Sequence, residues 1–389
     1  MPILNPSESA ISANAIYEIL DSSAILYKAF PQAINDNFEL ASGTKMTGKS
    51  GGLILQSTSG FALAARGKSM AYKDDALLVI RGTKKFADII SDANAFWVKP
   101  NGTRVHKGFN RVFESLKPQL DTFFINHHPA CVHIIGHSLG GAIGTLAAEW
   151  IKTTNKATSV KLYTFGCPRV GLSRYADVFT NLVGEDNIYR VYNPTDVVPM
   201  VPTYPYIHVP EPGTMNYASH YNTVWSPVSL WAHLMRNYIY GVEGQSWKKL
   251  SKPQVVAPFD NQYFDNHVEY WMATQNWASL SVHGIHMFYK VLVIILKKIL
   301  RETGQFFDAT AYVGATLIDR MAMYLEKGAR AVKEAGVLLT SLMRNILKAL
   351  GIIVNIPKDL TVVFIRWVFE RLSATLYFMA KTAMQNLYR

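Results

Sequence analysis

Apolar and polar residues follow two kinds of pattern over the first 250 positions. Short apolar runs of strand character occur at residues 51–56, 60–65, 76–81, 132–136, 160–165 and 187–192, and turn-forming residues follow most of them. Between these runs, apolar residues recur at helical spacing, first over residues 8–34 and again after residues 109 and 139. Strands that alternate with helices predict an α/β fold with a mainly parallel sheet, whose functional residues lie at the carboxyl ends of strands.

The pattern changes after about residue 247. Residues 251–285 contain proline-bearing segments and are expected to be a linker or extension. Helical patterns then run over residues 286–300, 309–338, 339–354 and 359–388 and mix basic with apolar positions. The chain is therefore divided into a domain at 1–250, a linker at 251–285 and a basic amphipathic α-helical extension at 286–389. This last region is interpreted either as a bundle or cover of helices, or as helices that lie in a membrane interface.

The positive charge is concentrated in the C-terminal third. The chain has a formal net charge of +11, and residues 276–389 hold 15 Lys/Arg against 7 Asp/Glu. Basic charge mixed with apolar helices favours an anionic lipid surface over nucleic acid, for which the sequence has no binding motif. No apolar run reaches the length of a conventional spanning helix.

Two features bear on compartment and cofactors. Cys131 and Cys167 fall on predicted strands and are expected to be buried free thiols, so they imply no oxidising compartment. The N-terminus lacks the basic-then-apolar pattern of a signal peptide. We expect the chain to be cytoplasmic as made, with any export left to a specialised secretion system. No metal or cofactor is expected.

One stretch joins a strand to a helix through a serine flanked by glycines. The apolar run ends at Gly136, Ser138 follows, and helical spacing begins at Leu139 and passes through Gly140. In this G-x-S-x-G arrangement the glycines let a serine occupy a tight, strained turn. The turn is expected to expose the Ser138 hydroxyl and to aim the Leu139 amide at an oxyanion. Ser138 is the predicted nucleophile.

Five short motifs follow one another along the chain. They are Ile80-Arg81-Gly82-Thr83, Val105-His106-Lys107-Gly108-Phe109, Gly136-His137-Ser138-Leu139-Gly140-Gly141, Thr164-Phe165-Gly166-Cys167-Pro168-Arg169-Val170-Gly171 and Asp196-Val197-Val198-Pro199. Over roughly residues 50–245 they resemble the class 3 lipases, α/β-hydrolases that include fungal triacylglycerol lipases and bacterial phospholipases A1. The resemblance implies an α/β-hydrolase fold with a Ser-Asp-His order of catalytic residues.

The resemblance also assigns the other site residues. It implies that Asp196 is the acid orienting a catalytic histidine, although an aspartate before Pro199 is also a common turn cap. Thr83 corresponds to the second oxyanion donor beside Leu139, and His106 and Asp92 to residues that brace its loop. Residues 84–90 fall where fungal members carry an amphipathic lid, the alternative being a short surface helix.

Four histidines follow Asp196 at a suitable distance. His208 resembles a structural position of the family, and His220 lies in a polar loop without matching context. His233, with a tyrosine five residues later, resembles the bacterial members, whereas His267, with a tyrosine three residues later, resembles the fungal ones. The shorter separation from Asp196 favours His233 as the base and leaves His267 as the alternative.

The sequence therefore predicts a serine carboxylic-ester hydrolase that releases fatty acid from glycerolipid, of the phospholipase A1 or lipase type, acting at a membrane surface. A toxic lipase of this kind would require a neutralising partner protein in its producer. The alternative is a membrane-binding or pore-forming toxin whose effect comes from the C-terminal helices.

Overall fold

The computed structural model describes most of the chain. It covers residues 2–21, 27–51, 56–83, 89, 96–125, 127–193, 195–210, 217–218, 229, 231–251, 268, 272, 280, 282–305, 307 and 316–386. By its internal contacts the chain divides into an α/β unit (Met1–Tyr221, Ser229–Pro253 and Met379–Arg389), named the hydrolase unit after its resemblance to the α/β-hydrolases, and a helical unit (Asn222–Val228 and Gln254–Phe378).

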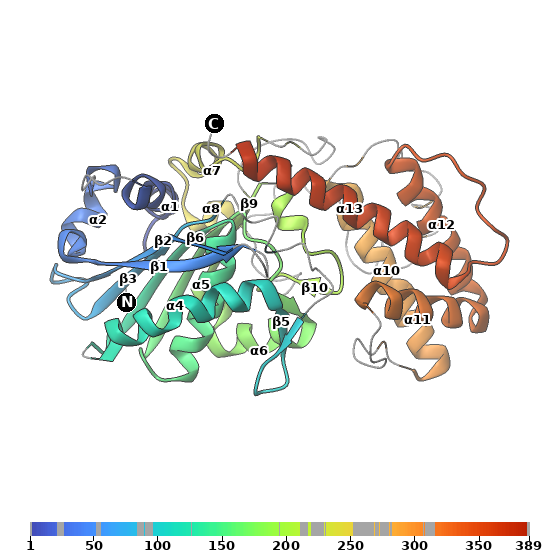
Figure 1. The fold of residues 1–389 in the computed structure, drawn as a ribbon, viewed down its shortest axis with the longest axis horizontal. Coiled ribbons are helices and arrows are strands. Elements are labelled where there is room, and N and C mark those ends of the chain that lie inside the picture. The colour runs from blue at the N-terminus through green and yellow to red at the C-terminus, as the bar shows by residue number, and fades with distance from the viewer. Residues whose placement is uncertain are drawn as a thin grey trace. The chain divides into compact units, whose positions relative to one another are not determined.

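A seven-stranded sheet forms the centre of the hydrolase unit (Figure 1). Its strand order is β1-β2-β3-β6-β7-β9-β11. The strands from β3 to β11 are parallel, and β1 and β2 extend the sheet as an antiparallel ribbon. The bounds are β1 Thr44–Gly51, β2 Gln56–Arg66, β3 Asp75–Ile80, β6 Cys131–His137, β7 Ser159–Phe165, β9 Ile188–Tyr192 and β11 Tyr217–Ala218. The mainly parallel α/β fold predicted from the sequence is confirmed.

Helices cover both faces of this sheet, which explains why its central strands are apolar throughout. Figure 1 shows α4 (Lys107–Ile125), α5 (Leu139–Thr153) and α6 (Ser173–Val183) along one face. The opposite face carries α1 (Pro6–Asp21) and α7 (Met235–Val242). Side-chain alternation matches this arrangement: Ile135 joins the core under α1, whereas Ile134 packs beneath Gly144 of α5.

Smaller elements complete the hydrolase unit. A second, antiparallel sheet has the order β10-β8-β5-β4. Its strands are β10 Tyr206–Ile207, β8 Gly171–Leu172, β5 Arg104–His106 and β4 Phe96–Val98, and the short helices are α2 (Gln32–Asn37) and α8 (Trp247–Leu250).

The helical unit consists of α10 (Val282–Thr303), α11 (Leu317–Ala331), α12 (Lys333–Ala349) and α13 (Val362–Asn386) up to Phe378. Its helices bury apolar side chains such as Val291, Leu325, Leu339 and Ile365. Within the described residues, none of the helices has the length and apolarity that crossing a bilayer requires.

Some predicted boundaries were wrong. The first strand occupies residues 44–51, ahead of the predicted run at 51–56, because a polar edge strand gives no apolar run; residues 52–55 of that run lie outside the described residues. The long N-terminal helix ends at Asp21. Helices α11 and α12 meet at Val332, which has extended backbone, whereas the apolar spacing runs on without a break.

Candidate active site

Ser138 lies in the sharp turn between β6 and α5. Its backbone has φ 57° and ψ −129°, a strained conformation for a residue with a side chain. The flanking glycines are sterically required. A Cβ at Gly136 would lie 2.3 Å from the Gly140 carbonyl oxygen, and a Cβ at Gly140 would lie 2.1 Å from the Ile80 carbonyl oxygen. The turn therefore has the geometry expected of a nucleophile elbow.

Asp196 and His233 form a buried pair. Asp196 follows the end of β9, and its Oδ1 accepts a hydrogen bond of 2.9 Å from the Val198 amide. Its Oδ2 lies 2.7 Å from His233 Nδ1 and accepts a second hydrogen bond, of 2.6 Å, from the Tyr238 hydroxyl. Among the described residues, His233 Nε2 has no hydrogen-bond partner. With Nδ1 donating to the carboxylate, Nε2 carries the lone pair that can accept a proton.

Gly166, which directly follows β7, packs against both residues of this pair. It has φ 58°, and a Cβ there would lie 3.0 Å from both Asp196 Oδ2 and His233 Cε1. The Tyr238 hydroxyl would be 2.9 Å away. Burial and the adjacent Asp196 carboxylate raise the pKa of Tyr238 well above its usual value, so the hydroxyl stays a donor.

Two backbone segments next to Ser138 offer hydrogen-bond donors. The Leu139 amide belongs to the first turn of α5, whose N–H groups cannot be satisfied within the helix. On the other side, a Cβ at Gly82 would lie 3.0 Å from Ser138 Cβ, and the buried Thr83 follows directly. Leu139 and Thr83 thus flank the serine from α5 and from the loop after β3.

A C-terminal segment covers the serine. The Ser138 hydroxyl donates to Met384 Sδ at 3.3 Å, and both side chains are completely buried. Met384 lies in the last turns of α13, which belong to the same unit as Ser138. The expectation that the elbow exposes Ser138 is therefore wrong for this arrangement, because a helix that the motif does not include packs over it.

Comparison with known proteins finds a match over the segment that contains the elbow and Asp196. Residues 77–205 match the family model for lipase (class 3). This segment is similar to the class 3 lipases. The matched segment includes Thr83, Ser138, Leu139 and Asp196 and ends before His233.

The proteins to which this chain is similar are bacterial and fungal. It is 34% identical over 118 residues to "Toxin TseL" of Vibrio cholerae, a match that covers 30% of this chain and 18% of the toxin. It is 30% identical over 192 residues to a secreted mono- and diacylglycerol lipase, MDL2, of Malassezia globosa, covering 46% of this chain and 55% of that protein. The chain thus matches about a fifth of the length of the toxin and about half of the length of the fungal lipase.

Among solved structures, the triacylglyceride lipase of Rhizomucor miehei aligns with a TM-score of 0.39 and 22% identity, covering 56% of this chain and 79% of that one.

A hydrogen-bonded chain connects helix α1 to the elbow. The Gly82 amide donates to the Tyr17 hydroxyl at 2.9 Å, and that hydroxyl lies 2.8 Å from His137 Nδ1. His137 Nε2 lies 3.0 Å from the His233 carbonyl oxygen, which fixes Nε2 as the protonated nitrogen and lets Tyr17 donate to Nδ1. Burial and the neighbouring His233 lower the pKa of His137 well below its usual value, so the ring is neutral.

Several predicted residues fall elsewhere. His208 is half-buried, and His106 is buried against the Phe109 ring, with its Nδ1 accepting from the Gly108 amide. His267, His220, Asp92 and, apart from the buried Ile89, the proposed lid at 84–90 lie outside the described residues. Sequence reasoning did not identify Tyr17 or Met384. Neither residue lies in a motif, and only the fold brings them to the elbow.

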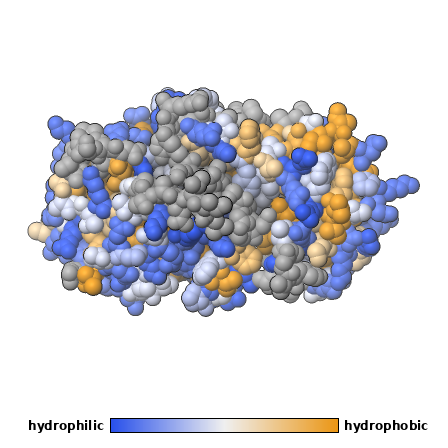
Figure 2. All heavy atoms as spheres, viewed as in Figure 1, coloured by the Kyte–Doolittle hydropathy of each residue, from blue (hydrophilic) through white to orange (hydrophobic). Residues whose placement is uncertain are grey.

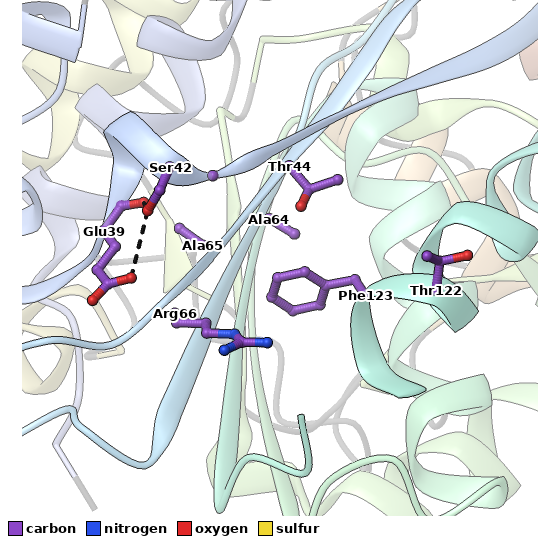
Figure 3. Close-up of a pocket in the computed structure, with 9 residues that line it drawn as sticks. Glu39, Ser42, Thr44, Ala64, Ala65, Arg66, Thr122 and Phe123 are labelled. Atoms are coloured by element: carbon purple, nitrogen blue, oxygen red, sulfur yellow. Dashed lines mark hydrogen bonds between the residues drawn. The ribbon is translucent and has the colours of Figure 1, made fainter. Parts of the chain in front are cut away.

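A surface hollow of about 390 Å³ lies away from this site (Figure 3). It is formed where β1 begins and β2 ends, and Arg66 of β2 pairs with Ala76 at the start of β3. Ser138 follows the opposite, carboxyl end of the parallel strands. Glu39, Arg66 and Phe123 line the hollow, and it shares no residue with the elbow.

Proposed function

We propose that this chain is a serine ester hydrolase that releases fatty acid from glycerolipid, of the phospholipase A1 type. The observation that carries the proposal is the buried Asp196–His233 pair, in which Nδ1 is held at 2.7 Å from the carboxylate and Nε2 has no partner among the described residues. The strained Ser138 turn in the same unit supplies a hydroxyl of the kind that such a base activates.

The first half of the reaction forms an acyl-enzyme. The Ser138 hydroxyl leaves Met384 and turns to His233, whose Nε2 takes its proton as Oγ attacks the ester carbonyl carbon. The carbonyl π electrons move to oxygen, and the Leu139 and Thr83 amides stabilise the resulting oxyanion. Each such donor typically contributes about 3 kcal/mol to transition-state stability. Collapse expels the glycerolipid alcohol, which takes its proton from His233.

The second half restores the enzyme. Water attacks the acyl-enzyme, His233 takes the proton from this water, and the returning proton releases Ser138 and a fatty acid. Asp196 stays ionised throughout and stabilises the imidazolium, with Tyr238 holding its Oδ2.

Replacing the proposed triad tests this function. Ser138→Ala and His233→Ala should each lower fatty-acid release from phosphatidylglycerol vesicles by about a thousandfold or more. His128→Ala, at an exposed histidine of the same unit, is the matched control and should retain activity. Full activity of the His233→Ala protein would remove His233 as the base and leave His267 to be tested in the same way.

The basic helical region supports a preference for anionic phospholipid. Residues 276–389 carry an excess of positive charge, which attracts acidic head groups. Fatty-acid release should therefore be faster from phosphatidylglycerol than from phosphatidylcholine vesicles or triolein emulsions. Equal rates on all three would contradict this preference, while leaving ester hydrolysis itself intact.

We also propose that the chain acts as a toxic effector, which damages the lipids of another cell. The name of the Vibrio relative, a toxin, supports it. The chain would be made in the cytoplasm, leave by a specialised secretion system and be matched by a neutralising partner in its producer. Directing the wild-type chain and its Ser138→Ala variant to the periplasm of a test bacterium should arrest growth only with the former. Equal toxicity would instead support a pore-forming activity of the helices.

A further inference from the structure

The connection between α12 and α13 presents apolar side chains to solvent. We name residues 351–360 the α12–α13 tip. Ile353 is 99% exposed and Val354 42% exposed, and Val363, in the first turn of α13, is 75% exposed. Single exposed apolar residues are ordinary, but a cluster on one short connection costs solvation free energy without serving the core. Figure 2 shows hydrophobic surface over the part of the molecule where Figure 1 draws α12 and α13.

The tip is held in place at its start. Gly351 has φ 69°, its amide donates to the Lys348 carbonyl at 3.0 Å, and the Ile352 amide donates to the Leu347 carbonyl at 2.9 Å. This pair of hydrogen bonds is the Schellman arrangement that ends a helix at a defined residue. The exposed side chains therefore project from a fixed helix end.

Positive charges flank the tip. Arg344 and Lys348 stand one helical turn apart on the exposed side of α12, and Lys358 is exposed beyond the apolar residues. Within the part of the chain that the structure describes, these three make no ion pair. Most of the acids that the structure describes in the helical unit, by contrast, already form ion pairs, as in Lys298–Glu334, Arg330–Glu326 and Arg366–Asp319. Asp359 is the tip's own acidic residue.

From this combination we infer that the α12–α13 tip is a membrane-docking element, in which Ile353 and Val354 enter the acyl region of an anionic bilayer while Arg344, Lys348 and Lys358 bind its head groups. The inference rests on the proposed lipid hydrolase and names how that enzyme reaches its substrate. A protein partner would need polar groups matched to the tip, whereas a lipid surface offers anionic and apolar groups at the required depths.

Vesicle binding by the Ser138→Ala protein, which cannot consume lipid, tests the inference. Ile353→Asp combined with Val354→Asp should weaken binding to phosphatidylglycerol vesicles by about tenfold or more. The matched control is Ile125→Asp, at a 73% exposed isoleucine of the hydrolase unit, and should bind like the parent. Lys348→Glu with Lys358→Glu should remove the preference for phosphatidylglycerol over phosphatidylcholine.

A fluorescent reporter gives an independent reading. Both native cysteines are buried, so an environment-sensitive dye can be attached at Val354→Cys. Its emission should shift to the blue on vesicle addition. Unchanged binding of the double aspartate variant, or an unshifted dye, would overturn the inference. When Ser138 is kept, the double aspartate variant should hydrolyse a soluble short-chain ester as fast as the wild type. If neither the wild type nor the variant hydrolyses this ester, the proposed function is refuted instead.

A separate observation concerns access to Ser138. Ala380, Ala383 and Met384, one turn apart on α13, are all completely buried, and Met384 Sδ accepts the hydrogen bond of the nucleophile. A thioether is a weak acceptor, and an ester carbon must occupy the space in front of Ser138 Oγ for attack. We propose that residues 379–386 are an intramolecular cover, which an apolar acyl chain displaces. This too rests on the proposed function.

Labelling Ser138 with a fluorophosphonate measures this access directly. Met384→Ala should raise both the labelling rate and the hydrolysis of a soluble short-chain ester several-fold, whereas Met384→Leu, which keeps the apolar volume, should resemble the parent. Met70→Ala, at an exposed methionine of the same unit, is the control. Equal rates in the parent and Met384→Ala would overturn the cover alone. Failure of every protein to label at Ser138 would refute both the cover and the proposed nucleophile.

Discussion

Gly166 illustrates how closely the acid and the base are packed. Its backbone needs positive φ, and the space beside it is filled by Asp196, His233 and Tyr238 at about the distance of closest approach. Any side chain at this position must push at least one of these groups away. The Asp196–His233 distance therefore depends on a residue that takes no part in the chemistry.

Gly166→Ala should lose both stability and activity. Positive φ costs an alanine about 1–2 kcal/mol, and the displaced His233 should lower ester hydrolysis by about a hundredfold. Gly102→Ala separates the two effects, because Gly102 has φ 77° with nothing within 4 Å of the added Cβ. It should lose similar stability, measured by amide hydrogen exchange in the central sheet, and keep its activity. Equal activity loss in both variants would contradict the steric explanation.

We expect Tyr17 to position the Gly82–Thr83 loop beside Ser138. Tyr17→Phe removes the acceptor of the Gly82 amide and the donor to His137 Nδ1. We expect kcat on a soluble ester to fall by about tenfold with KM nearly unchanged, because the Gly82–Thr83 loop loses a fixed geometry that matters in the transition state. Tyr324→Phe, which removes a hydroxyl bonded to the Gln305 carbonyl, is the matched control. A change in KM alone would argue against this role.

At the scale of elements, helix α11 depends on a reciprocal cap. Thr316 Oγ1 accepts from the Asp319 amide at 3.1 Å, and Asp319 Oδ2 accepts from the Thr316 amide at 2.9 Å. Asp319 Oδ1 is also 3.0 Å from Arg366 of α13, so one carboxylate connects the start of α11 with another helix. These bonds to the ionised form lower the pKa of Asp319, although partial burial opposes them.

Thr316→Ala should therefore destabilise α11 by about 1 kcal/mol. Amide hydrogen exchange in the first turns of α11 is the suitable measurement, because the chain has two units and a single unfolding transition is not assured. Thr340→Ala removes a hydroxyl that bonds only to the carbonyl four residues earlier in α12. It should leave exchange unchanged, and faster exchange in both variants would rule out a capping effect.

At the scale of the whole molecule, buried neutral histidines make the hydrolase unit sensitive to acid. Burial, helped by Arg111, lowers the pKa of His106 to about 3, and burial also lowers the pKa of His133 and His137. In the unfolded chain these rings bind protons near pH 6.5, whereas in the folded protein each binds its proton only at a lower pH. The unfolded state thus gains protons first as the pH falls.

The free energy of unfolding should consequently drop between about pH 6.5 and pH 4, by up to about 1.4 kcal/mol per pH unit for each such histidine. Amide hydrogen exchange of the slowest-exchanging amides in the central sheet, corrected for the intrinsic exchange rate at each pH, measures this slope. His106→Gln should make it shallower, and His128→Gln, at an exposed position, should not. A stability independent of pH over this range would show that these rings are protonated in the folded state.

The sequence predicted local features better than distant ones. The elbow, the aspartate after β9 and the Gly82–Thr83 loop could be predicted from short motifs, because the geometry of each depends on a few neighbouring residues. Their assembly with His233 came from resemblance. Tyr17 and Met384 reach the elbow from 120 and 246 residues away, so no spacing pattern reports them. The edge strand β1 was not predicted at its true position because its residues are polar. The boundary between α11 and α12 was not predicted because both helices bury apolar faces.

Helix α1 has a practical consequence for anyone dividing this chain. The segment that matches the family model starts at residue 77, yet the hydroxyl that accepts from the Gly82 amide comes from Tyr17, and the imidazole paired with Asp196 comes after residue 205. A fragment trimmed to residues 77–205 would begin inside β3 and would lack β1, β2 and β11 of the seven-stranded sheet, together with helix α1. The ends of the segment that matches the family model therefore differ from the ends of the folded unit that contains it.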